Sequence, residues 1–159
     1  MTAYWVTGIP EKSASQVRET LQSAQYPHPA TVDVARGYGP CRSCLQTFRS
    51  GQEERILFTY NPFEGLDAYP LPGPIFVHRV DCQQYSGSAF PAGLRTLPLT
   101  FEGYGRSRWP VSREACTNED VEGAIARLFA HPAVDYIHVR NTEAGCFIAL
   151  ILRAPVTGL

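Results

Sequence analysis

The stretch VDYIHVR-NTEAG-CFIALILR, residues 134–153, decides the fold of this chain. Two strand-like segments, Val134–Arg140 and Cys146–Arg153, flank a short loop that ends in glycine. Two such runs joined by three to five residues that include a glycine are typical of a β-hairpin. Apolar side chains occur at both odd and even positions of the second run, so neither face of the hairpin reads as solvent-exposed. We therefore predict that this hairpin lies in the centre of a sheet.

The register of the hairpin follows from the loop if Arg140 pairs with Cys146. His138 is then opposite Ile148, and side chains alternate between the two faces of each strand. One face carries His138, Arg140 and Cys146 toward the loop end. The other face is apolar and is predicted to enter the core: Ile137, Val139, Phe147, Ala149 and Ile151.

Outward from the hairpin, the remaining pattern predicts a single α+β domain over residues 1–159. Its parts are a mixed, largely antiparallel sheet, two principal helices and long ordered loops. A long loop rich in proline and glycine is predicted over Asn61–Gly73. The helices are predicted from Ser13 or Ser15 to about Ala24 and over Glu119–Ala130, and the other strands at Tyr4–Ile9, Thr31–Ala35, Glu54–Tyr60, Pro74–Val80 and, interrupted by Pro98, Leu94–Phe101.

Composition excludes several classes of partner. The 159 residues carry 14 basic and 15 acidic side chains and only one lysine, Lys12, so a basic nucleic-acid surface is not expected. No apolar run is long enough to span a bilayer, and no secretion signal is visible at the N-terminus. The five cysteines are an odd number in a chain large enough to fold without disulfides. We expect reduced thiols in a cytoplasm, no nucleic-acid partner and no membrane partner.

The most informative turn is GYGPCRSCL, residues 37–45, which places Cys41 and Cys44 three positions apart with Arg42 between them. Glycine and proline make this segment a turn rather than the interior of a helix or strand. Such a turn can present its side chains to a ligand or to the core.

Three motifs carry a resemblance to a known family: Gly39–Leu45, Gly73–His78, and His138–Asn141 followed by Gly145 and Cys146. In this order they resemble the domain-of-unknown-function family 1203, which consists of small, mostly bacterial proteins. The resemblance runs from about Tyr4 to Arg153. It implies no assigned activity. It does imply that the Pro-Cys-Arg turn and the His-x-Arg-Asn strand end are central to the family, and that serine can replace the thiol at Cys44.

One interpretation of the thiols is a metal site. Cys41, Cys44, His78 and Cys82 supply the ligand types of tetrahedral zinc. His78 and Cys82 would be roughly 13 Å apart on a continuous strand, so the chain must turn after Val80. Two alternatives remain open: buried thiols that act as small apolar groups, and a redox pair at Cys41 and Cys44.

A second interpretation joins the turn to the hairpin, because the family motifs suggest that both belong to one site. Cys41 and His138 would then be a catalytic nucleophile and base. Guanidinium groups bind carboxylate or phosphate in a fork. The predicted ligand-binding residues are Arg42, Arg140, Asn141 and Cys146. The bland alternatives are an Arg42 that bonds backbone carbonyls, an Arg140 paired with Glu143 or Asp135, and a satisfied core histidine at 138.

The sequence therefore leaves three hypotheses and does not establish whether the protein is an enzyme. The first is a pocket for a small anion, lined by arginine and histidine, with thiol chemistry at Cys41 and no cofactor. The second is a zinc-stabilised protein-interaction module without catalysis. The third is a purely structural role for all these residues, with the function at an unrecognised protein interface. Cys116 receives no role.

Overall fold

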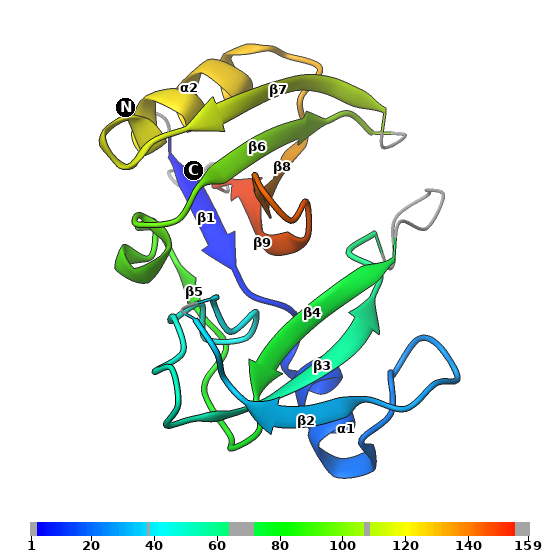
Figure 1. The fold of residues 1–159 in the computed structure, drawn as a ribbon. Coiled ribbons are helices and arrows are strands. Elements are labelled where there is room, and N and C mark those ends of the chain that lie inside the picture. The colour runs from blue at the N-terminus through cyan, green and yellow to red at the C-terminus, as the bar shows by residue number, and fades with distance from the viewer. Residues whose placement is uncertain (1–2, 38, 64–71, 107–108, 155–159) are drawn as a thin grey trace.

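The computed structural model describes residues 3–37, 39–63, 72–106 and 109–154. Within these residues the chain forms two α-helices, two 3-10 helices and nine strands (Figure 1). Residues 64–71 of the predicted Asn61–Gly73 loop lie outside the described residues. In chain order the elements are β1 (Tyr4–Thr7), α1 (Glu11–Thr20), β2 (Thr31–Val34), β3 (Glu54–Tyr60), β4 (Gly73–His78), β5 (Ser86–Gly87), η1 (Ala92–Leu94), β6 (Leu99–Tyr104), β7 (Pro110–Cys116), η2 (Asn118–Asp120), α2 (Val121–Ala130), β8 (Tyr136–Asn141) and β9 (Phe147–Arg153).

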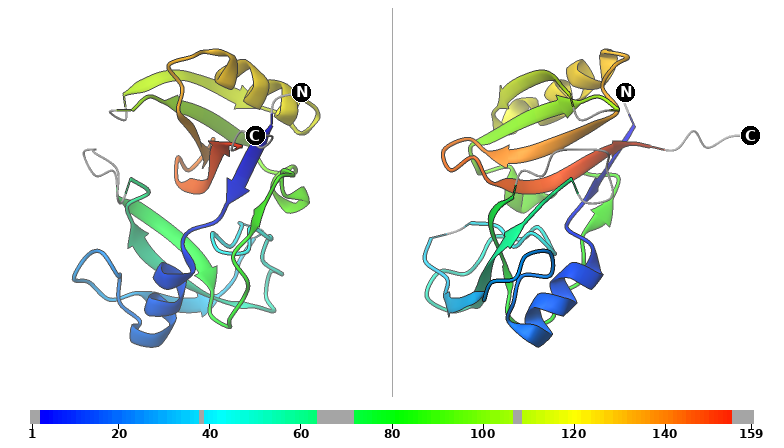
Figure 2. Two further views of the ribbon diagram at one scale, coloured as in Figure 1. Left: turned by 180° about the vertical axis from the view of Figure 1, so that it is seen from behind. Right: turned by 90° about the vertical axis from the view of Figure 1, so that its right-hand side faces the viewer.

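The described strands pair into two antiparallel sheets (Figures 1 and 2). The larger sheet has the strand order β5-β1-β9-β8-β6-β7, and the smaller has β2-β3-β4. Helix α2 covers the face of the larger sheet that looks away from the smaller one, and α1 lies beside the smaller sheet. The α+β class with two principal helices is confirmed, although the strands divide into two sheets. No helix in the described part of the chain is long and apolar enough to cross a bilayer.

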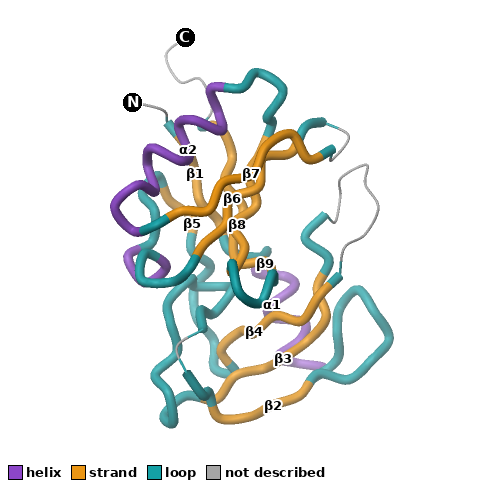
Figure 3. The backbone as a smooth tube through the Cα atoms, turned by 45° about the horizontal axis from the view of Figure 1, so that its top comes forward, coloured by secondary structure: helices purple, strands orange, loops and turns teal. Residues whose placement is uncertain are grey.

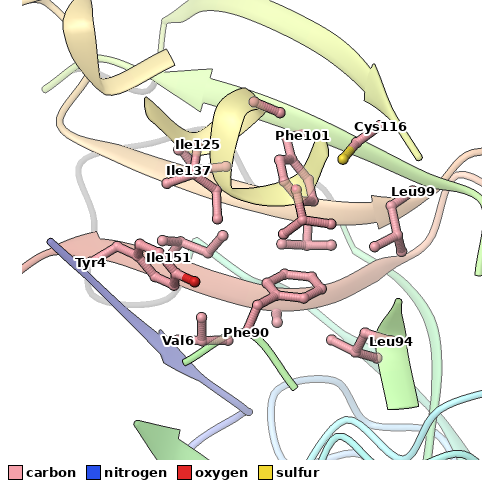
Figure 4. Close-up of a cluster of buried hydrophobic side chains, with 14 of the residues drawn as sticks. Tyr4, Val6, Phe90, Leu94, Leu99, Phe101, Cys116, Ile125, Ile137 and Ile151 are labelled. Carbon is pink, nitrogen blue, oxygen red and sulfur yellow. The ribbon is translucent and has the colours of Figure 1, made fainter. Parts of the chain in front are cut away.

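The main core fills the space between α2 and the larger sheet (Figure 4). Phe101 of β6, Ile137 of β8 and Ile151 of β9 are fully buried there. The apolar side chains of α2 recur at helical spacing on one face, and Val121, Ile125, Leu128 and Phe129 are all buried. This core makes the larger sheet a rigid platform for the hairpin side chains that face the smaller sheet.

The hairpin is central in its sheet, as predicted, but the predicted register is wrong. His138 pairs with Leu150 rather than with Ile148, and Arg140 pairs with Phe147 after a bulge. A bulge adds one residue to a strand and shifts the alternation of the faces beyond it. Phe147 therefore turns to the face of His138, while Ile148 joins the main core. The wrong register buried apolar residues on both faces too, so hydrophobicity alone did not exclude it.

Proline and polar edges explain the other differences. The predicted strand at Leu94–Phe101 begins only at Leu99, because Pro98 has no N–H for the strand ladder. Helix α1 starts directly after Pro10 and ends at Thr20, where Leu21 takes a left-handed conformation. Strand β7 was not predicted. It lies at the edge of the larger sheet and most of its side chains are exposed, so it has little apolar pattern.

The smaller sheet has its own core, which joins it to the larger one. Ile56, Phe58, Ile75 and Val77 of β3 and β4 pack with Val17 of α1 and with Phe147 of β9. Cys41 is buried in the same cluster. The loops that follow β2 and β4 meet at one end of this sheet (Figure 3). These two loops carry Cys41, Cys44 and Cys82.

Gly8 allows the end of β1 to approach the thiol turn closely. A Cβ atom at residue 8 would lie 2.2 Å from the Ser43 carbonyl oxygen and 2.5 Å from that of Arg42. The next residue fastens the approach, because the Ile9 N–H donates to the Arg42 carbonyl at 2.8 Å. Backbone atoms cannot give way as a flexible side chain can.

We predict that Gly8→Ala destabilises the protein by about 1–3 kcal/mol, because the added methyl group overpacks a backbone contact. Chemical denaturation followed by tryptophan fluorescence measures this difference. Gly39→Ala is the matched control, since nothing lies within 4 Å of a Cβ at that position. Equal stability of the two variants would contradict the close approach.

Candidate metal centre and interlayer cavity

The structure brings Cys41, Cys44, His78 and Cys82 together. Their ligand atoms all lie within 4.8 Å of one another. The first two thiols project from a tight turn in which the Cys41 N–H donates to Gln46 and the Leu45 N–H donates to Cys41. His78 is the last residue of β4, and the chain bends at residues 79 and 80 so that Cys82 returns to the cluster. The turn that the metal interpretation required after Val80 is therefore present.

Two distances within this thiol–histidine cluster match the edges of a zinc tetrahedron. Zinc bonds of ordinary length place two sulfur ligands about 3.8 Å apart, and a sulfur and an imidazole nitrogen about 3.5 Å apart. The Sγ atoms of Cys41 and Cys82 are 3.8 Å apart. The Sγ atom of Cys44 is 3.4 Å from Nδ1 of His78. These residues could hold a metal ion such as zinc with little rearrangement.

Two residues outside the cluster orient it. Nε2 of His78 is 3.3 Å from a carboxylate oxygen of Glu53, which leaves Nδ1 to face the thiols. Arg18 of α1 donates to the Cys82 sulfur at 3.1 Å and to the His78 carbonyl at 3.0 Å. A carboxylate on the far nitrogen of a ligand histidine and an N–H donor to a thiolate are usual companions of protein metal sites. Sequence reasoning missed both residues, since neither belongs to a local ligand motif.

The electrostatics of the cluster favour a positive charge at its centre. Hydrogen bonds with the Cys41 and Cys82 sulfur atoms raise the pKa of His78 to about 10. Hydrogen bonds from Cys41 and Cys44 lower the pKa of the Cys82 thiol. The pKa of His78 rises because anionic sulfur stabilises its cationic form, and the pKa of Cys82 falls because neighbouring thiols donate hydrogen bonds to its anionic form. A bound divalent cation would meet the same attraction.

Arg42 points away from the metal ligands and is buried against the hairpin. Its guanidinium donates to the carbonyls of Phe147 at 2.8 Å and Pro40 at 2.7 Å, and to the Cys146 sulfur at 3.2 Å. Thus the thiol turn and the hairpin do meet, as the second interpretation required. Arg42 joins the turn to the hairpin by donating hydrogen bonds to backbone carbonyls and to a thiol.

A cavity of about 570 Å³ opens between the two sheets. Arg140, Asn141 and Cys146 of the hairpin line it, together with Glu102 and Arg113 from β6 and β7. Arg140 is ion-paired with Glu102 at 2.5 Å, not with Glu143 or Asp135. The Asn141 side-chain oxygen accepts the N–H groups of residues 143 and 144, so it shapes the loop as well as the cavity wall.

His138 makes no hydrogen bond to Cys41. Its side chain is fully buried, and neither ring nitrogen has a hydrogen-bond partner among the described residues. Four aromatic rings surround it with centroids at 4.7–5.3 Å: Phe63, Tyr104, Tyr136 and Phe147. Burial, with a smaller contribution from Arg140, lowers the pKa of His138 to about 3. The structure thus shows a core histidine that lacks the hydrogen-bond partner of a satisfied one.

Cys116 is the remaining cysteine, and it belongs neither to the thiol–histidine cluster nor to the cavity lining. Cys116 ends β7, is buried in the main core and donates its S–H to the Thr117 carbonyl at 3.3 Å. Burial raises the pKa of its thiol to about 11. No disulfide joins any of the five cysteines, all of which lie in the described part of the chain.

We predict that His138 makes the protein acid-sensitive. The folded protein keeps this ring neutral down to about pH 3, whereas the unfolded chain protonates it below about pH 6.5. The unfolded state therefore binds more protons in this window, and stability falls as the pH falls, by at most about 1.4 kcal/mol per pH unit. His138→Phe should flatten the slope. Urea denaturation at pH 6.5 and pH 5 measures it.

The control for this experiment is His131→Gln, because His131 is exposed after α2. That variant should keep the slope of the parent protein. If His138→Phe and the parent lose stability equally between the two pH values, the buried ring does not carry the acid sensitivity.

Comparison with known proteins adds a family and no activity. A family model, DUF1203, described as a protein of unknown function, matches residues 38–153. This range contains the four cluster residues, the cavity-lining hairpin and Arg42. No curated protein and no solved structure matches the chain.

Proposed function

Because this chain belongs to the DUF1203 family, whose function is unknown, we propose a function from geometry alone: Cys41, Cys44, His78 and Cys82 hold a structural zinc ion. The observation that carries the proposal is the pair of cluster distances, 3.8 Å and 3.4 Å, that fit a zinc tetrahedron. Three thiolates and an imidazole select zinc over the hard cations. Four protein ligands leave no open position for a substrate, which is the arrangement of structural sites.

The zinc ion would fix a surface for interaction. It would fasten the thiol turn to the loop after β4, which has only the short bridge of β5 as regular structure before residue 90. That loop presents Val80, which is 73% exposed. This exposed apolar group beside the cluster supports a protein-interaction module without catalysis. The five unpaired thiols support a reducing, cytoplasmic setting.

We predict one zinc ion per chain in protein purified without a histidine tag. Elemental analysis measures the stoichiometry, and thermal unfolding with and without a strong chelator measures its effect. Because metal binding to the folded state adds to stability, chelation should lower the midpoint clearly.

Two variants sharpen this test. Cys44→Ser removes a ligand and should lower zinc affinity, whereas Cys116→Ser lies outside the cluster and should leave the stoichiometry unchanged. Glu53→Gln weakens the support of His78 and should lower affinity about 10- to 100-fold. Native-like protein that contains no zinc and ignores the chelator would rule out the metal centre.

A second candidate function is the binding of a small carboxylate or phosphate in the interlayer cavity. The observation that favours it is that Arg140, Asn141 and Cys146, named from sequence as ligand-binding, line this cavity together with Arg113. Arg42 supports the wall from behind. A nucleophile at Cys41 with His138 as its base fits less well, because the zinc ion would occupy Cys41 and aromatic rings enclose His138.

We predict that a small anion stabilises the protein against heat. A panel of phosphates and short carboxylates is screened by thermal shift. Saturation at 100 times the dissociation constant adds about 2.7 kcal/mol to stability. The shift should disappear in Arg140→Ala and persist in Arg36→Ala, an exposed arginine outside the cavity lining. A panel without any shift would count against anion binding.

A further inference from the structure

The charge of Arg42 lacks a conventional counter-ion. This side chain is only 3% exposed, and among the described residues no carboxylate forms an ion pair with it. Burial lowers the pKa of the guanidinium, but arginine stays charged in proteins. A buried charge is costly unless an opposite charge accompanies it. The two carbonyls that it bonds are neutral dipoles, so an anion is needed nearby.

Cys146 is the group at Arg42 that can supply this anion. Its sulfur accepts a hydrogen bond from Nη2 of Arg42 at 3.2 Å. The competing anion is the thiol–histidine cluster, whose zinc-bound form carries a net charge of −1. Arg18 donates to that cluster through Cys82 and also pairs with Asp81 at 3.8 Å. With the proposed zinc centre as its premise, Cys146 is the ionisable group outside the cluster that Arg42 hydrogen-bonds.

The position of Cys146 gives its sulfur access to a ligand. The residue is partly exposed and lines the interlayer cavity. Among the residues that the structure describes, the charged side chains lining the cavity are Arg113, Arg140 and Glu102, so this part of the lining has a net positive charge. Asn141 adds an amide. In contrast, Cys41 is fully buried in the cluster.

We propose that Cys146 is the nucleophile of the interlayer cavity, that Arg42 stabilises the negative charge on its sulfur during attack, and that the cavity directs to it a small carboxylate that carries an electrophilic carbon. The thiol chemistry first expected at Cys41 is thereby assigned to the hairpin. In the reaction the sulfur forms a bond to the electrophilic carbon. The bond from that carbon to its leaving group breaks, and the leaving group departs with the bonding electrons.

Alkylation by iodoacetate and by iodoacetamide tests the proposal. Iodoacetate is a carboxylate with such a carbon and loses iodide, and iodoacetamide is its neutral counterpart. Labelling at pH 6 is followed residue by residue by mass spectrometry, with zinc measured in the same sample. An ordinary thiol is only about 0.3% ionised at this pH. Because the Arg42 guanidinium stabilises negative charge on the attacking sulfur, Cys146 should react about tenfold faster than N-acetylcysteine amide.

The ratio of the two reagents reports the cavity. At Cys146 the rate with iodoacetate relative to iodoacetamide should exceed that of the small thiol at least threefold, and Arg140→Ala should abolish this preference. Arg42→Met should remove most of the rate, and Arg42→Lys should restore part of it. Cys116 in the same protein is the internal slow control, because burial raises the pKa of its thiol to about 11.

The outcomes separate this proposal from the zinc centre. A Cys146 that reacts within twofold of the small thiol with both reagents overturns the proposal, whatever the Arg42 variants do. Failure of the zinc centre appears instead as a low zinc content and as labelling of Cys41, Cys44 and Cys82. Fast, carboxylate-selective labelling at Cys146 confirms the proposal in wild-type protein even if the Arg42 variants do not fold.

Discussion

The burial of the Arg42 guanidinium is the interaction on which the rest of this structure depends. One side chain bonds the carbonyl of Phe147, more than a hundred residues away, and that of Pro40 in its own turn. Gly8, directly after β1, packs closely against backbone carbonyls of the same turn. The thiol turn is thereby fixed between the two sheets. Its cysteines then face the smaller sheet, while its arginine supports the wall of the cavity.

This arrangement divides the polar chemistry between two places. The thiol–histidine cluster has four ligand residues supported by Glu53 and Arg18, and it is suited to hold an ion. The cavity beside the hairpin has room for a ligand and an accessible thiol. Arg42 follows Cys41 of the cluster in the chain and hydrogen-bonds Cys146 at the cavity wall. His138 belongs to neither of these places, because its aromatic surroundings exclude hydrogen-bond partners.

Much of this organisation was predictable from local sequence. Alternation and loop length identified the central hairpin, and the spacing of Cys41, Cys44, His78 and Cys82 identified the cluster. The bulge before Arg140 was not predictable, because either register buries apolar residues on both faces. Arg18 and Glu53 were missed because tertiary packing alone brings them to the cluster. The polar edge strand β7 was not predicted, because its pairing with β6 makes it a strand and its own sequence has little apolar pattern.

The order in which the parts occur along the chain has a consequence for biosynthesis. All four cluster residues have left the ribosome once residue 82 emerges, so the part of the chain from α1 to Cys82 could gather around the proposed zinc ion while translation continues. The partners of Arg42 at residues 146 and 147 emerge last. Until they arrive, the guanidinium stays hydrated and the nascent chain lacks the docking partner that desolvates it. Closing of the hairpin onto this arginine is therefore the step that joins the two halves of the molecule.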